Sequence, residues 1–201
     1  MLIDLEEDRF EVGIRVAEML DEGCWTRSEI VENLLAEFDT LDASGLNSVV
    51  DEQVAEKRKR DADYPEVTDC DRLWSAFSRL REVNVLALHT PASTRSSCYH
   101  EALLQWRDHG GVSSGLIGAA YYDPQDVEAT ISEGELGISF VAFSNSSGQR
   151  QPSGEAQLGH LILTTLLESG LQAEWNSDIT KRVKVRMHWR KRFDAEAFGT
   201  V

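Results

Sequence analysis

Side chains that act as nucleophiles and bases are concentrated between His89 and His100. This stretch contains Cys98 together with several Ser and Thr residues. A Cys98/His100 or a Cys98/His89 pair is the combination used in nucleophilic catalysis, where a base activates a thiol. However, no third residue is identifiable that would orient the base, and loops that lead into helices are rich in Ser and Thr for capping reasons. We therefore assign no catalytic residue here and keep His89 as a possible ligand-binding residue.

A second polar group, Asp123, Gln125 and Asp126, follows an apolar segment that is predicted to be a strand. Ligands of α/β sheets often bind at the carboxyl ends of strands, and two carboxylates can hold Mg²⁺. The same residues also have a purely structural explanation, because Asp123 precedes Pro124 as a helix cap and Asp126 is a first-turn acid. All three are possible ligand-binding residues, and we predict no resident metal or cofactor.

The third group is basic and runs from Lys181 to Arg192, with Trp175 before it and Trp189 near its end. Cationic and aromatic side chains together can bind single-stranded nucleic acid. The formal net charge of −15 weakens long-range attraction to phosphate, so nucleic acid is not the expected partner. We favour a simpler interpretation, in which the basic strand face docks against the acidic N-terminal helices of the same chain; a solvated face is the other alternative.

The first third of the chain is predicted to contain three helices. Apolar residues recur at helical spacing over residues 5–22, and Thr26 with Glu29 forms a capping box before the next apolar run. A third helix is predicted over residues 46–60, and Pro65 marks a linker. We therefore expect an acidic helical segment over residues 1–62.

Helices and strands alternate in the remainder of the chain. Strands are predicted over residues 83–88, 116–122, 136–143, 171–175 and 182–189, and the last two are expected to form a hairpin. Gly170 is the expected end of a long, nearly apolar helix. This order predicts an α+β or α/β domain over residues 69–201, with a mixed sheet of about five strands and packed helices.

The negative charge is distributed unevenly. Residues 1–72 contain 21 of the 35 Asp and Glu residues but only 8 of the 20 Lys and Arg residues, a net charge of −13. Such a field attracts basic partners and repels nucleic acid and anionic membranes, although acidic helices can also serve solubility alone. We therefore predict a protein-binding module, such as an immunity-type inhibitor of a basic toxin or enzyme. Its expected binding residues are Asp4, Glu7, Asp8, Glu11, Asp21, Glu22 and Glu29, with Trp25 as aromatic anchor.

An enzyme acting on a small molecule, or depending on a metal, is the first alternative function, and a nucleic-acid-binding regulator that uses Lys181–Arg192 is the second. The enzyme would use the 89–100 loop and the Asp123–Asp126 turn, but the sequence contains no HExxH, GxSxG, phosphate-loop or dinucleotide motif. The three cysteines are far apart, and we find neither a signal peptide nor an 18-residue apolar run. We therefore expect a reduced, cytoplasmic protein with no membrane partner.

The second part of the chain resembles an uncharacterised bacterial family that is known only as a domain of unknown function. The resemblance covers about residues 69–192 and rests on the order of five short pieces: Asp71–Leu73 with Ala76 and Phe77, Tyr122–Asp126, Leu136–Phe140, Gly170–Leu171 with Glu174–Asn176, and Lys181–Val183 with Trp189–Arg192. It implies an α/β domain and no established activity. Some members carry paired cysteines after the first strand, where this chain has only Cys98.

Overall fold

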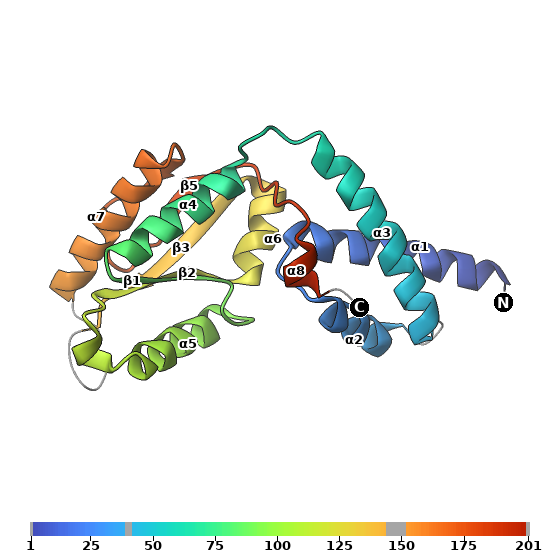
Figure 1. Cartoon of the computed structure of the whole chain (residues 1–201), viewed down its shortest axis with the longest axis horizontal. Coiled ribbons are helices and arrows are strands. Elements are labelled where there is room, and N and C mark those ends of the chain that lie inside the picture. The colour runs from blue at the N-terminus through green and yellow to red at the C-terminus, as the bar shows by residue number, and fades with distance from the viewer. Residues whose placement is uncertain (1, 39–41, 144–151, 200–201) are drawn as a thin grey trace. The chain divides into compact units, whose positions relative to one another are not determined.

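A computed structural model describes residues 2–38, 42–143 and 152–199, without the side chains of residues 2–8 and 152–153. Its internal contacts divide the chain into two compact units (Figure 1). The helical unit comprises Met1–Glu66 together with Arg190–Val201, and the sheet unit comprises Val67–Trp189. None of the described helices combines the length and apolar composition that crossing a membrane requires.

The described part of the helical unit contains three long helices and one short one. They are α1 (Leu2–Glu22), α2 (Arg27–Glu37), α3 (Ala43–Ala62) and α8 (Ala195–Phe198). The predicted capping box is present, because Thr26 and Glu29 satisfy each other's backbone N–H groups at the start of α2. Val12 and Val16 of α1, Leu34 of α2 and Val50 of α3 share one buried core.

The chain end belongs to this helical unit. Residues 190–201, which the sequence led us to place with the second domain, contribute Phe198 to the helical core, and Phe193 packs against it. A buried charge holds the segment in place: Lys57 is 1% exposed, and its Nζ lies 2.6 Å from Asp61 Oδ1 and 2.7 Å from the Lys191 carbonyl oxygen. Both contacts are needed because an unpaired buried ammonium group is strongly destabilising.

The sheet unit has the mixed five-stranded sheet and packed helices that the sequence predicts. The strand order is β1-β2-β3-β5-β4, with β1 and β2 parallel and every other pair antiparallel. The predicted hairpin is confirmed as the antiparallel β4–β5 pair. The elements are α4 (Asp69–Glu82), β1 (Val85–His89), α5 (Arg95–Asp108), the 3-10 turn η1 (Gly111–Ser114), β2 (Gly118–Tyr122), α6 (Pro124–Glu133), β3 (Glu135–Val141), α7 (Pro152–Glu168), β4 (Gln172–Glu174) and β5 (Val183–Arg186).

The two faces of the sheet are covered unequally. Helices α4 and α7 pack on one face, where the main core includes Phe77, Ile138 and Ile162 (Figure 1). Helix α5 packs on the other face, over β1 and β2, in a second core around Trp106. Because side chains alternate along a strand, β5 presents Lys184 and Arg186 on this second face, and both are exposed there. The second face is therefore apolar beneath α5 and polar at β5.

Replacing Gly170 by Val is expected to destabilise the sheet unit by about 1 kcal/mol or more. Gly170 ends α7 with φ of +83°, a left-handed conformation in which a Cβ is unfavourable. The measurement is the urea unfolding midpoint of the full chain. Gln172→Val is the matched control, since a β-branched residue suits this exposed strand position. Equal midpoints for Gly170→Val and wild type would contradict the expected strain.

Candidate functional site

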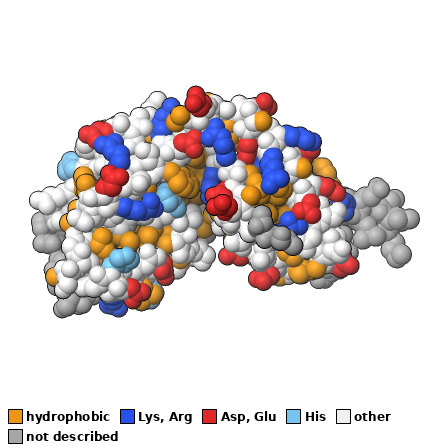
Figure 2. All heavy atoms as spheres, viewed as in Figure 1, with side chains coloured by type: hydrophobic (Ala, Val, Ile, Leu, Met, Phe, Trp, Pro, Cys, Tyr) orange, Lys and Arg blue, Asp and Glu red, His pale blue; other side chains and the backbone are white. Residues whose placement is uncertain are grey.

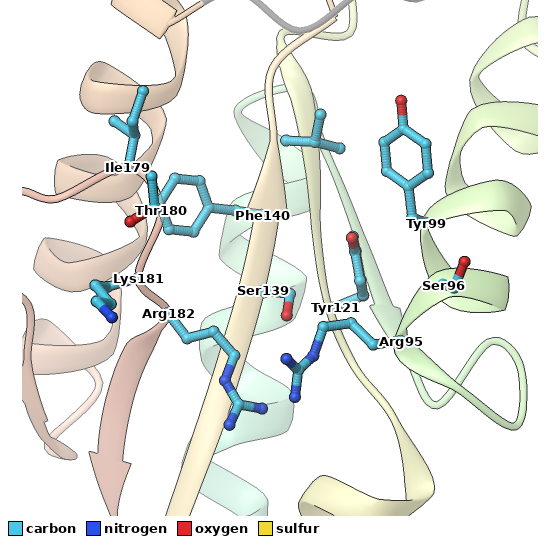
Figure 3. Close-up of a pocket in the computed structure, with 11 residues that line it drawn as sticks. Arg95, Ser96, Tyr99, Tyr121, Ser139, Phe140, Ile179, Thr180, Lys181 and Arg182 are labelled. Atoms are coloured by element: carbon cyan, nitrogen blue, oxygen red, sulfur yellow. The ribbon is translucent and has the colours of Figure 1, made fainter.

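A pocket lies where α5 stops covering the second face of the sheet. Its volume is about 630 Å³, and its walls include Arg95, Tyr99, Ser139, Ile179 and Arg182 (Figure 3). This volume lies within the usual range for small-molecule sites. All of the lining residues belong to the sheet unit.

Arg95 enters the pocket from the first turn of α5. Thr94 caps this helix: its hydroxyl oxygen accepts from the Ser97 backbone N–H, and the Ser97 hydroxyl oxygen accepts from the Thr94 backbone N–H. Arg95 is therefore the first helical residue, and Tyr99 lies one turn later on the same side of the helix. Figure 3 shows Arg95 reaching from α5 toward the strand that carries Ser139.

Ser139 forms part of the pocket floor. It lies on β3 directly opposite Tyr121 of β2, so both residues are on the face that α5 partly covers. Ser139 is 7% exposed, and its Oγ has no hydrogen-bond partner within the described part of the chain. Because burying a hydroxyl without a partner costs about 1–3 kcal/mol, this serine calls for an explanation.

Arg182 reaches the same place from the opposite side. It precedes β5, and its guanidinium lies over Gly137 of β3, where a Cβ would collide with it. Glycine inside a strand often marks such a close approach. In Figure 3 the guanidinium groups of Arg95 and Arg182 come from opposite sides to the region beside Ser139.

Two buried carboxylates lie beside these arginines, and one of them accepts a hydrogen bond from Arg182. Asp126 Oδ1 accepts a hydrogen bond from Arg182 Nη1 and lies 3.8 Å from Arg95 Nη2. Asp123 Oδ2 lies 4.0 Å from Arg95 Nε. The acids also cap α6, since the Asp123 side chain accepts from the Asp126 backbone N–H and the Asp126 side chain accepts from that of Asp123. Burial is the main cause that raises the pKa of Asp123, the nearby Asp126 charge raises it further, and the arginines oppose the shift.

The pocket wall is cationic although the chain is strongly acidic. Arg95, Lys181 and Arg182 line it, and none of its lining residues is an Asp or Glu. Arg95 uses none of its side-chain N–H groups in a hydrogen bond within the described residues, because both of its carboxylate contacts exceed hydrogen-bond length. The pocket therefore offers unused donors to an anion.

The predicted ligand residues are partly brought together. Asp123 and Asp126 lie beneath the pocket as partners of its arginines, and Gln125 Nε2 donates to the Ser93 carbonyl oxygen at 2.7 Å. His89 lies on the other face of the sheet, stacked between Trp74 and Phe77 with centroid distances of 4.2 and 4.6 Å. Within the described chain, no cluster of three or more His, Cys, Asp or Glu side chains could hold a metal ion. Ligand binding by these residues stays a prediction.

The Cys98/His100 pair is not assembled. Cys98 is fully buried in the core beneath α5 and donates from Sγ to the Ala92 carbonyl oxygen at 3.2 Å, while His100 is exposed. Burial is the main cause that raises the pKa of Cys98 to about 11. The reactive thiolate of Cys98 is therefore scarce at neutral pH.

Several predicted partner-binding acids have internal roles in the helical unit. Asp21 Oδ1 accepts from Arg60 at 3.0 Å, buried Glu22 accepts from the Trp25 indole N–H, and Glu29 belongs to the capping box. Glu11 is exposed. The side chains of Asp4, Glu7 and Asp8 lie outside the described residues. On the face drawn in Figure 2, Asp and Glu side chains are interspersed with Lys and Arg.

The basic run from Lys181 to Arg192 does not form one surface in a single unit. Lys184 pairs with Glu135 at 2.7 Å within the sheet unit. In the helical unit, Lys191 Nζ donates to the Gly23 carbonyl oxygen and Arg192 Nη2 donates to that of Pro65. The part that contributes to the pocket is Lys181 and Arg182 alone.

Sequence reasoning missed the residues that line this pocket. Arg95 fell inside the loop we considered, and Arg182 fell inside the basic run, but nothing in the sequence linked them. Ser139 was part of a predicted strand and carried no signal. Gly137, a glycine within that strand, was the available hint of a close approach.

The fold and pocket define an α+β protein with a mixed five-stranded sheet, helices on both faces and a cationic pocket on one. A family model described as a domain of unknown function (DUF6891) matches residues 6–193, and the chain belongs to this family. The match confirms the family resemblance and extends it over most of the described α1–α3 region as well. No curated protein and no solved structure matches the chain significantly.

Asp123→Asn is expected to flatten the pH dependence of stability. The raised pKa of Asp123 means that the folded state retains this proton better than the unfolded chain does. Wild type should therefore lose stability relative to the variant as the pH rises from about 4 through the raised pKa. Asn is an equally good helix cap, so the comparison isolates the charge. The measurement is the urea midpoint across this range.

Asp178→Asn is the control variant, because the pKa of Asp178 is shifted in the opposite direction and its effect on the pH dependence of stability has the opposite sign. Hydrogen bonds from the Thr180 side chain and backbone lower the pKa of Asp178. Its contribution to stability is present above the unfolded pKa and is lost as the pH falls through the folded one. If Asp123→Asn and wild type had parallel pH profiles, the assigned charge burial at Asp123 would be wrong.

Proposed function

We propose that the sheet unit binds a small organic anion. The observation that carries this proposal is the convergence of Arg95 and Arg182, from α5 and from the residue before β5, on the buried Ser139, whose hydroxyl has no hydrogen-bond partner among the described residues. Guanidinium groups recognise carboxylate and phosphate oxygens through paired N–H donors. A bound anion would also give the Ser139 hydroxyl an acceptor and offset the cost of its burial.

Asp126 supports this function by fixing Arg182 in place, while both acids lie within 4.0 Å of Arg95. Held by Asp126, the Arg182 side chain loses less conformational freedom on binding, which lowers the entropic cost of association. Only one Arg182 nitrogen is used in that contact, so other N–H groups remain for a ligand. This role replaces the magnesium site considered from the sequence, because carboxylates paired with arginines are poorly available to a cation.

Sodium phosphate is the first probe. We expect it to raise the melting temperature of the full chain by linkage, and to do so less at high ionic strength. Arg95→Gln combined with Arg182→Gln should abolish the shift. The matched control is Arg107→Gln, which removes an exposed arginine from the far end of the same helix. A shift of equal size in the double variant and in wild type would exclude this pocket as the anion site.

Binding of a basic protein by the acidic helices is the second candidate. It is supported by the net charge of −13 over residues 1–72 and by exposed acids on α1 and α2: Glu11, Glu32 and Glu37. An inhibitor of a basic toxin or enzyme would use such charges to accelerate association. The test is an affinity pull-down from native lysate at low salt. The bound protein is then titrated against wild type and Glu11→Lys/Glu32→Lys/Glu37→Lys.

If the acidic charges steer the basic protein electrostatically, the charge-reversed variant should associate with it at least about tenfold more slowly at low salt. The dissociation rate should change little. Arg9→Gln with Arg15→Gln, which removes cations from the same helix α1, is the control and should not slow association. An association rate unaffected by the reversal would remove the support for an electrostatic partner surface.

A further inference from the structure

The donors around the pocket's polar end come from three separate elements. Arg95 comes from α5, Ser139 from β3 and Arg182 from the segment before β5. The start of α5 adds to this set, because Ser96 lines the pocket and the first backbone N–H groups of a helix have no acceptor within it. The helix dipole also places partial positive charge at this end.

This arrangement favours a tetrahedral anion over a planar one. A carboxylate has two oxygens in one plane, whereas a phosphoryl group has three terminal oxygens that point in different directions. Donors on three elements, together with the start of a helix, match the second geometry. The buried Ser139 Oγ, which has no partner in the described structure, is the independent observation that a ligand atom belongs here.

The other end of the pocket is apolar. Tyr99 and Ile179 lie there, away from the two guanidinium groups (Figure 3). The ring of Tyr99 forms the wall on the α5 side, and its hydroxyl points away from the arginines. A phosphate ion alone would leave most of the roughly 630 Å³ unfilled, so the remaining space fits an organic group.

We infer that the ligand is a phosphomonoester with an apolar or aromatic body, an inference that rests on the proposed function. Its phosphoryl group lies between Arg95 and Arg182 and accepts a hydrogen bond from Ser139. Its organic part lies against Tyr99 and Ile179. The binding energy therefore comes from two sources, charge-assisted hydrogen bonds at one end and removal of apolar surface from water at the other.

The experiment compares phenyl phosphate, inorganic phosphate and benzoate by calorimetric titration of the full chain. Phenyl phosphate should bind at least about tenfold more tightly than inorganic phosphate, because its ring is buried. Benzoate, which has the ring but not the tetrahedral group, should bind more weakly than phenyl phosphate. All binding should be lost in Arg95→Gln/Arg182→Gln.

Two further variants separate the two ends of the pocket. Ser139→Ala should weaken binding of both phosphates about fivefold while leaving the melting temperature of the free protein unchanged or higher, because the Ser139 hydroxyl makes no hydrogen bond within the described residues. Tyr99→Ala should weaken phenyl phosphate but not inorganic phosphate. Leu104→Ala, which truncates an exposed apolar side chain on the same helix, is the control for Tyr99→Ala.

The outcomes distinguish this inference from the proposed function. If both phosphates bound equally tightly and the double arginine variant bound neither, the inferred apolar part of the ligand would be wrong. The proposed anion site would still be supported. If benzoate bound as tightly as phenyl phosphate, the inference that the ligand carries a phosphoryl group would be wrong. If none of the three probes bound, both the inference and the proposed function would be overturned.

Discussion

The stability of the sheet unit depends on how the charges of two buried carboxylates are compensated. Asp123 and Asp126 are 3% and 6% exposed, and each is needed to cap α6. Burying two neighbouring acids is costly unless cations or hydrogen bonds accompany them. Arg182 and Arg95 provide that compensation from two other elements, so α5, α6 and the start of β5 are tied to one small region. The candidate site is the solvent-facing side of this arrangement.

The unequal cover of the sheet creates the space in which this arrangement matters. Helix α5 lies over β1 and β2, while the same face at β5 presents charged side chains. If a second helix covered β3 and β5, Arg182 would have to be buried with Asp126 as a closed ion pair. Because no helix of the described residues provides that cover, the arginines stay partly exposed, at 56% for Arg95 and 36% for Arg182. The same feature makes the face polar and accessible to a ligand.

The sequence predicted the architecture well because that information is local. Alternating apolar residues marked the strands, and capping residues such as Thr26 and Asp123 marked helix starts. The site was not predictable in the same way, since it depends on which residues meet across the sheet. The register that places Ser139 opposite Tyr121 is a property of strand pairing, which local periodicity does not determine. The packing of Phe193 and Phe198 in the helical unit is likewise a long-range feature.

Gly137 has a consequence for anyone who tries to make this protein more robust. A glycine in a strand interior is conformationally expensive, and standard stabilisation schemes would fill it with a β-branched residue. Here the missing side chain is the space in which the Arg182 guanidinium lies. Filling the position would improve local strand propensity and expel the arginine. At this residue a gain in strand propensity would be offset by leaving the buried Asp126 charge without its partner, so the glycine is a structural requirement of the Arg182–Asp126 ion pair.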